Sequence, residues 1–266
     1  MTAGPLDPPL VAVRSAVGRA LAEDLLPLGD ITASLVPEGA TARARVVARS
    51  AGVVAGRLCA IEAFAQVDPA VAVDWELADG SPVVAGSVVA RVSGPLPSIL
   101  TAERTALNFL CHLSGVATAA RLYVDAVAGA NPATRVLDTR KTTPGLRALE
   151  KAAVRAGGAH NHRGSLSEAV LVKDNHLGGL TIAEAVARAR HRWPGRLVEV
   201  ECDRADQVTE ALEAGATAVL LDNMTPDEVA SCVALVWAHP TPVSVGAITH
   251  SAPVLDLGLD LDTGEG

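Results

Sequence analysis

Lysine is scarce in this 266-residue chain: there are three, all between residues 141 and 173, and the other nineteen basic residues are arginines. A lipoyl or biotinyl carrier needs a lysine to modify, and none precedes Lys141, so the DGSPVVAG turn of the N-terminal half does not belong to such a carrier. A broad basic field is also missing, because the formal net charge is −8. Nucleic-acid binding relies on such a field, so no nucleic-acid partner is expected and any anion site must be local.

Cysteine pairs, signal sequences and long apolar runs are absent as well. The four cysteines lie far apart in apolar runs without a C-x-x-C pair, which favours reduced core residues over disulfides or metal ligands. The N-terminus lacks the basic and apolar blocks of a signal peptide, and no apolar run approaches the roughly 18 residues of a membrane helix. These absences predict a cytoplasmic protein with no membrane partner.

The N-terminal half predicts a small α+β unit. Apolar residues at helical spacing predict a helix over residues 9–26, and β-branched residues between turn signals predict strands over 43–50, 71–79 and 87–94. A further helix is expected over 56–67, among these strands. Residues 98–130 read as long helical material with a break near Ser114 and Gly115.

The C-terminal half alternates short apolar strands with helices, which is typical of parallel βα units. Neither G-x-G-x-x-G nor a P-loop motif is present, so a barrel is favoured over a nucleotide-binding doubly wound sheet. We expect an N-terminal domain over residues 1–110, joined by residues 251–266, and a barrel domain over 111–250. The predicted strands are 135–138, 169–173, 197–201, 218–222 and 242–246, and the predicted helices are 144–156, 181–193, 204–215 and 225–238.

Polar residues follow four of these five strands, where the reactive groups of parallel βα folds lie. They are Asp138, Arg140 and Lys141 after the first, Lys173, Asp174 and Asn175 after the second, Glu199 and Glu201 in the third, and Asp222 and Asn223 after the fourth. The stretch 135–176 holds eight basic residues against four acidic ones in an otherwise acidic chain. It therefore predicts a local anion site.

The basic residues of this stretch divide into two groups. Arg147, Lys151 and Arg155 recur every four residues along one predicted helix, which is typical of a solvated face, so we expect a structural role or a subunit contact for them. The second group lies at strand ends or in the short loops that lead to them, and we expect it to bind substrate: Arg140, Lys141, Arg163 and Lys173. His162 and His176 lie beside members of this group.

The residue types indicate a polyanionic substrate. Arginine clamps carboxylate or phosphate through a planar fork, whereas lysine supplies a compact point charge. Glu201 and Asp222, at neighbouring strand ends, predict a site for Mg²⁺, which carboxylates hold while basic groups hold phosphates. Alternatively, these carboxylates cap helices or pair with nearby arginines. No H-x-x-x-H spacing supports zinc.

Seven motifs together resemble the quinolinate phosphoribosyltransferase family: TAERTALNFLCHLSGVAT, DTRKTTPGLRALEKAAVRAGG, HNHR, VLVKDNH, VEVE, LLDN and VGAITHSAPVLDLGLD. The resemblance runs from the GDIT turn near residue 29 to the C-terminus. It implies an N-terminal α+β sandwich domain, an incomplete TIM-like α/β barrel and a homodimer, with a higher oligomer as a further option. The implied reaction joins quinolinate to phosphoribosyl pyrophosphate with Mg²⁺, giving nicotinate mononucleotide, pyrophosphate and CO₂.

The resemblance also implies roles for individual residues. Arg104 would enter the site of the neighbouring subunit, and Arg140, Arg163 and Lys173 would bind quinolinate. Lys141 and His162 would hold the phosphoribosyl donor, while Glu201 and Asp222 would lie near its ribose hydroxyls and the metal. Lys141, Glu201 and Asp222 are thus the expected catalytic residues. The remaining expected substrate-binding residues are Asp174, Gly246 and His250.

One departure from the family pattern motivates alternatives. Between LLDN and VGAITH, about one βα unit of roughly 20 to 30 residues is missing, together with a Glu-x-Ser-Gly-Gly turn expected to hold the sugar 5′-phosphate. A catalytically impaired paralogue that binds quinolinate or a nucleotide is therefore a second hypothesis. A third takes Lys173 as the Schiff-base lysine of an aldolase-like barrel, since a lysine at a strand end can serve that chemistry.

Overall fold

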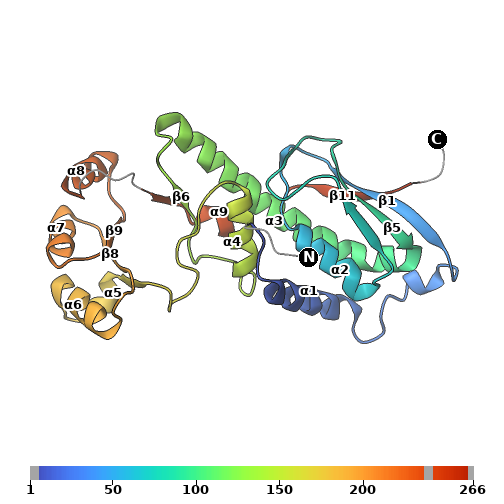
Figure 1. Ribbon diagram of the computed structural model, residues 1–266, viewed down its shortest axis with the longest axis horizontal. Helices are drawn as coiled ribbons and strands as arrows, with labels where there is room; N and C mark the ends of the chain where they lie inside the picture. The colour runs from blue at the N-terminus through green and yellow to red at the C-terminus, as the bar shows by residue number, and fades with distance from the viewer. Residues whose placement is uncertain (1–5, 237–241, 263–266) are drawn as a thin grey trace. The chain divides into compact units, whose positions relative to one another are not determined.

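The computed structural model describes residues 6–236 and 242–262 (Figure 1). The chain divides into two compact units, and of the described residues the first contains 6–162 and 242–262 and the second 163–236. The domain boundary expected near residue 110 stays a prediction, and helix α3 (Leu96–Ala130) runs through it.

The first unit contains a four-stranded antiparallel sheet in the order β11-β1-β5-β3. Its members are β1 (Thr41–Ala48), β3 (Ala72–Trp75), β5 (Val88–Pro95) and β11 (Leu257–Leu261). The three strands expected in the N-terminal half are thereby confirmed. Strand β11 adds the C-terminal segment to this sheet through five residue pairs with β1, from Ala44–Leu261 to Ala48–Leu257.

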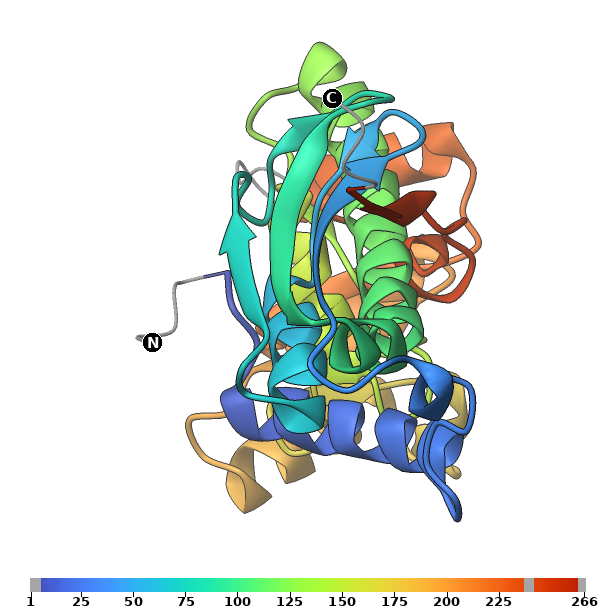
Figure 2. The same ribbon diagram turned by 90° about the vertical axis from the view of Figure 1, so that its right-hand side faces the viewer.

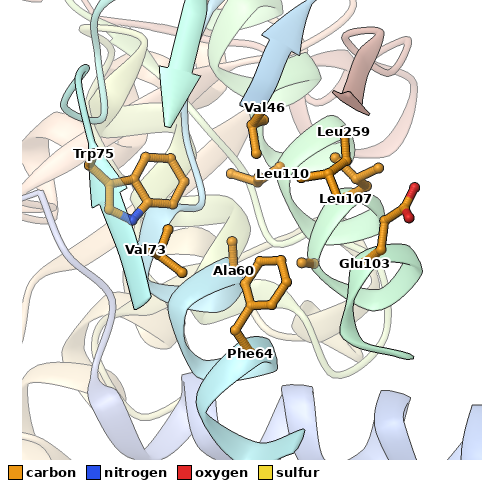
Figure 3. A pocket seen from close by; sticks show the side chains of 10 residues that line it. Val46, Ala60, Phe64, Val73, Trp75, Glu103, Leu107, Leu110 and Leu259 are labelled. Carbon is orange, nitrogen blue, oxygen red and sulfur yellow. The ribbon is translucent and has the colours of Figure 1, made fainter. Parts of the chain in front are cut away.

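Helices α2 (Arg57–Val67) and α3 pack against the sheet, and Figure 2 shows α3 behind the strands. Helix α1 (Leu10–Leu25) packs against α2 and α3. Short elements complete this part, namely the 3₁₀ helix η1 (Ala33–Leu35) and the pair β2 (Gly52–Val53) and β4 (Pro82–Val83). Between sheet and helices, Phe64, Leu110 and Trp75 surround a hollow of only about 10 Å³ (Figure 3). Its lining is apolar apart from Glu103, so we interpret it as a packing gap in the core.

The break expected in α3 near Ser114 and Gly115 was wrong, because the helix is continuous over 35 residues. Both small residues allow close packing. The buried Ser114 hydroxyl accepts a hydrogen bond from the Ala55 amide (3.0 Å) and donates one to the Ala55 carbonyl (3.1 Å). A Cβ on Gly115 would lie 2.1 Å from the carbonyl oxygen of Pro253, so the missing side chain makes room for the C-terminal segment.

The first unit also carries a small parallel pair beyond α3. Strand β6 (Val136–Leu137) pairs with β10 (Val243–Ser244), and Leu137 forms an isolated parallel bridge with His160. Helix α4 (Arg147–Ala156) follows β6 and begins three residues later than expected, and α9 (Ala247–His250) follows β10. These elements bring residues near 140, 160 and 246 to one end of two short strands.

The second unit is a three-stranded parallel sheet in the order β7-β8-β9. Its strands are β7 (Val170–Val172), β8 (Val198–Cys202) and β9 (Ala218–Leu221), and its helices are α5 (Asp174–Leu177), α6 (Ile182–Arg192), α7 (Ala205–Glu213) and α8 (Pro226–Val236). Helices α6, α7 and α8 lie side by side along this sheet (Figure 1). A separate apolar core that includes Val186, Val200 and Val208 holds them together.

The mixed α/β class is confirmed, and all five strands of the C-terminal half form as expected. In residues 6–236 and 242–262 the parallel strands make two separate sheets and no closed barrel. The junction at which the missing βα unit is predicted includes residues 237–241, which lie outside the described residues. No described helix is both long and apolar enough to cross a membrane.

Two glycines of α3 give a matched test of the packing at Pro253. Gly115→Ala is expected to lower the free energy of unfolding by about 1 to 3 kcal/mol, because its methyl group would overlap the backbone of residues 253 and 254. Gly129→Ala meets no atom within 4 Å and is expected to raise it, by up to about 1 kcal/mol. Urea unfolding of both variants measures the difference, and equal stabilities would contradict the assigned packing.

Candidate active site

The loop after β6 carries Arg140 and Lys141 and is held by two neighbours. Thr249 of α9 donates a hydrogen bond from its hydroxyl to the Lys141 carbonyl (2.8 Å), and the Lys141 amide donates to the Thr139 hydroxyl (3.1 Å). Arg140 is half-buried, and its buried Nε has no hydrogen-bond partner among the described residues. Because an unpaired buried N–H is costly, this atom is suited to an acceptor from outside the chain.

Lys141, Gly246 and His250 lie together, although more than 100 residues of sequence separate the first from the others. A Cβ on Gly246 would be 3.2 Å from Lys141 Cδ and 3.4 Å from His250 Nε2. The parallel pairing of β6 with β10 causes this proximity, since both strands end at the same edge. The ring of His250 is oriented by its neighbour, because Nδ1 lies 2.6 Å from the Ser251 hydroxyl.

A buried network that the sequence did not predict begins at Asp138, at the end of β6. Asp138 is fully buried, and Lys151 of α4 donates to its Oδ1 from Nζ (2.5 Å). Asn161 donates to Asp138 Oδ2 (2.7 Å), and the backbone amide of His162 donates to Oδ1 (2.8 Å). The prediction that Lys151 belongs to a solvated helix face was therefore wrong, because this side chain turns inward to a buried carboxylate.

A second buried carboxylate, that of Glu150, binds the backbone of the TRKTTPG loop (residues 139–145). Glu150 is fully buried; its Oε1 lies 2.8 Å from His112 Nε2, and its Oε2 accepts a hydrogen bond from the Thr143 amide (3.1 Å). Arg147 donates from Nε to the Thr142 hydroxyl (3.1 Å). Glu150 lies on α4, and a loop separates it from Arg140 and Lys141, so no local spacing in the sequence relates it to them.

Arg104 is exposed on α3. With Asn108 and His112 on the same face of the helix, it lines a pocket of about 260 Å³ whose other wall includes Glu23 and Asp24. The adjacent GDIT turn is tied to α3, because Thr101 donates to Asp30 Oδ2 (3.0 Å). The Ala33 amide donates to Asp30 Oδ1 (2.8 Å), and this bond lowers the pKa of the carboxyl despite the opposing effect of burial.

In the second unit, polar residues from the ends of all three strands line one pocket of about 100 Å³. They include Lys173 and Asp174 after β7, Glu201 in β8, and Asp222 and Asn223 after β9. Lys173 Nζ donates to Glu201 Oε2 (2.5 Å), and the side chains are 38% and 17% exposed. Glu201 is therefore paired with a lysine at a neighbouring strand end, whereas the alternative drawn from the sequence was pairing with an arginine.

The eleven expected site residues fall into the two units. Arg104, Arg140, Lys141, His162, Gly246 and His250 belong to the first, and Arg163, Lys173, Asp174, Glu201 and Asp222 belong to the second. Arg163 donates from Nη1 to the carbonyl of Ala169, the residue before β7 (2.8 Å). Each unit thus contains part of the expected set of residues. The roles assigned to these residues stay predictions.

The carboxylates at the strand ends of the second unit are the candidate metal ligands. No group of three or more His, Cys, Asp or Glu in the described ranges is placed to hold a metal ion by itself. Mg²⁺ commonly takes one or two protein carboxylates and completes its shell with water and substrate oxygens. Glu201 and Asp222, which line the same pocket, fit that mode of binding.

The cysteines offer no nucleophile. All four are free, and three are buried. Burial raises the pKa of the Cys59 thiol to about 12 and that of the Cys202 thiol to about 11. Because the thiolate is the reactive form, both stay protonated and inert at neutral pH, as the sequence predicts for core residues.

Comparisons with known proteins agree with this arrangement over nearly the whole chain. The family model for the quinolinate phosphoribosyl transferase N-terminal domain matches residues 30–114, and the model for the C-terminal domain matches residues 116–243. A probable carboxylating nicotinate-nucleotide pyrophosphorylase from Synechocystis is 42% identical over 231 residues, which cover 86% of this chain and 77% of that protein.

Two further relatives match almost end to end. The carboxylating nicotinate-nucleotide pyrophosphorylase of Mycobacterium leprae is 36% identical over 279 positions that cover 94% of this chain and 97% of that protein. That alignment is longer than this chain, so it contains positions at which this chain has no residue. The structure of the Francisella tularensis nicotinate-nucleotide pyrophosphorylase superposes with a TM-score of 0.91 at 34% identity, covering 98% of this chain and all of that one. The chain belongs to the quinolinate phosphoribosyl transferase family.

Proposed function

We propose that this protein transfers the phosphoribosyl group of phosphoribosyl pyrophosphate to quinolinate and decarboxylates the product to nicotinate mononucleotide, releasing pyrophosphate and CO₂. The observation that carries the proposal is the gathering of family-motif residues at strand ends: Lys141 beside Gly246 and His250, and Lys173 in one pocket with Glu201 and Asp222. Charged groups of these types suit a diacid and a polyphosphate. The free cysteines support a cytoplasmic location.

Quinolinate carries two carboxylates, which match the arginines and lysine assigned to it. Arg140 offers a guanidinium whose buried Nε lacks a partner among the described residues. Lys173 holds the Glu201 carboxylate in the structure, and a substrate carboxylate would compete for the same ammonium. Substrate binding would therefore release Glu201 toward the ribose hydroxyls or the metal.

The transfer step requires no nucleophile from the protein. The ring nitrogen of quinolinate attacks C1′ of the donor while the bond from C1′ to pyrophosphate breaks, through a state with oxocarbenium character. Lys141 and His162 would hold the donor and stabilise the charge that develops on the departing pyrophosphate. In the following step the bond from ring carbon 2 to its carboxylate breaks and CO₂ leaves; the electron pair stays on carbon 2, where the adjacent positively charged ring nitrogen stabilises it, and it then takes up a proton.

Mg²⁺ would be held by Glu201 and Asp222 and by oxygens of the donor, and would neutralise pyrophosphate charge. Both carboxylates come from strand ends of the three-stranded sheet, and Asp222 is exposed enough to reach a metal through water. The register of β8 and β9, in which Glu201 pairs with Leu220, fixes the position of Glu201 relative to the end of β9, which Asp222 follows.

The surroundings of Lys173 speak against the Schiff-base alternative. A lysine that attacks a carbonyl must be neutral, which an apolar pocket or a neighbouring cation favours. Lys173 instead lies 2.5 Å from the Glu201 carboxylate, so its nitrogen is engaged in an ion pair and is not surrounded by apolar groups or cations. The impaired-paralogue hypothesis makes a different forecast: quinolinate would bind in calorimetry, but no CO₂ would be released.

The first test follows CO₂ release from quinolinate, phosphoribosyl pyrophosphate and Mg²⁺. Lys141→Ala and Arg163→Ala are each expected to lower kcat/KM by about 10²-fold, because each removes a positioned charge. Arg91→Ala is the control, since Arg91 is 57% exposed and pairs with Glu76 in the N-terminal sheet. Near-normal turnover in both site variants would refute the assignment of these residues.

Gly246 gives a second test, aimed at the donor. Gly246→Ala would place a methyl group 3.2 Å from Lys141 Cδ, so the Lys141 side chain must shift slightly, and 3.4 Å from His250 Nε2, in contact with that ring. The backbone needs no positive φ there, because φ is −67°. We expect normal stability and roughly a two- to tenfold weaker affinity for pyrophosphate in calorimetry, the equivalent of one displaced hydrogen-bonding group. Unchanged pyrophosphate affinity would argue against a donor site at Gly246.

The homodimer is supported by exposed apolar side chains in the segment before and within η1. Leu26, Leu28, Ile31 and Leu35 are between 67% and 82% exposed, an unusual concentration for a surface in contact with water. Arg104 is exposed on α3, to which this segment is tied through Asp30. We propose that a second copy covers this segment and receives Arg104 in its site.

Mixing two inactive variants tests whether Arg104 acts across the interface. In a mixture of Arg104→Ala and Lys141→Ala subunits, half of the randomly assembled dimers are mixed and each has one intact site, so roughly a quarter of wild-type activity is expected. A mixture of Arg140→Ala and Lys141→Ala should stay inactive, because each change disables the site of the subunit that carries it. No recovery in the first mixture would place Arg104 in its own subunit's site, whereas an Arg104→Ala variant that is active by itself would place Arg104 outside the chemistry.

A further inference from the structure

We propose that the buried ion pair of Asp138 and Lys151 is a positioning device that fixes the backbone at His162 for the phosphoribosyl donor. The inference rests on the proposed function and extends it to two residues that contact no substrate. Lys151 lies on α4 and Asp138 at the end of β6, both within the first unit. This role would explain the position of Lys151, the one lysine of the three that is not assigned to a substrate.

The pair holds both polar groups of the His162 backbone. The His162 amide donates to Asp138 Oδ1 (2.8 Å), and Lys151 Nζ donates to the His162 carbonyl (2.8 Å). The ion pair itself closes the ring, with Nζ 2.5 Å from Oδ1. Two charge-assisted hydrogen bonds to one residue leave its backbone little freedom to translate or rotate.

The neighbouring residue reinforces this geometry. Asn161 donates from Nδ2 to Asp138 Oδ2 (2.7 Å) and to the Lys151 carbonyl (2.9 Å), and its Oδ1 accepts a hydrogen bond from Arg155 (2.6 Å). Arg155 also binds the carbonyls of Leu6 and Asp7. Both oxygens of Asp138 are thereby occupied by protein donors, so this carboxylate is not available to a ligand.

Stability alone does not account for such an arrangement. A buried ion pair loses its hydration, and apolar residues in its place are often equally stable or more so. Asp138 is fully buried, and Lys151 is only 7% exposed. Apolar residues could not form directional hydrogen bonds. The hydrogen bonds of the ion pair fix the backbone position of His162, a residue assigned to donor binding.

A variant that removes both charges separates positioning from folding. Losing one partner would leave an uncompensated buried charge, whereas Asp138→Asn combined with Lys151→Met removes both together. The double variant is expected to fold, as circular dichroism and urea unfolding would verify. Its kcat/KM for phosphoribosyl pyrophosphate is expected to fall by roughly tenfold or more, since small misplacements of a catalytic group are costly.

The decisive readout is a double-mutant cycle with His162→Ala. If the pair acts through His162, the charge-free double change costs roughly tenfold with His162 present and less than about twofold once the imidazole is gone. A purely structural role would give the same loss in both backgrounds, and that result would overturn the inference. Should the double variant not fold, Asn161→Ala removes one support of Asp138 and enters the same cycle.

Two controls complete the experiment. Ser114→Ala removes a fully buried hydroxyl that bonds the Ala55 backbone, and it should lower stability while leaving kcat/KM for the donor unchanged. Wild-type protein that releases no CO₂ would overturn the proposed function itself. Active wild type with additive losses in the cycle would overturn only the positioning role of Asp138 and Lys151.

Discussion

Parallel pairing of short strands is the constraint on which the candidate site depends. In a parallel pair both strands end at the same edge, so residues far apart in sequence meet wherever two strand ends are neighbours. The pairing of Val243 with Val136 places Gly246 beside Lys141, and the register of β7, β8 and β9 places Lys173, Glu201 and Asp222 around one pocket. The strands are only two to five residues long, so each site residue follows its pairing closely.

In the first unit, two buried carboxylates lie behind the loops that follow β6. Asp138 and Glu150 are both fully buried, and each accepts a hydrogen bond from a backbone amide in a loop that carries expected binding residues. Their partners, Lys151 and His112, come from α4 and α3. Hydrogen bonds thus connect the polar loops to α4 and α3. These bonds fix the orientation of the loop backbone, which apolar contacts alone do not.

The three lysines show how one residue type serves three environments. Lys141 is exposed next to Gly246, Lys151 is enclosed with a carboxylate, and Lys173 is partly exposed and paired with Glu201. An arginine is bulkier and its charge is spread over a plane, whereas a lysine ammonium is compact and fits between a carboxylate and a carbonyl. That difference is a physical reason for lysine at position 151 in a chain that otherwise uses arginine.

The sequence by itself determined the alternating strands and helices, the strand-end positions of the charged residues and the family, because these depend on local periodicity and on contiguous motifs. Only the tertiary structure decided that Ser114 and Gly115 lie in an unbroken helix, since their role is close contact with Ala55 and Pro253. The same holds for Lys151, whose helical spacing predicted a solvated face. Periodicity identifies neighbours along one helix, but the partner of a buried charge comes from another element, and only the folded chain brings the two together.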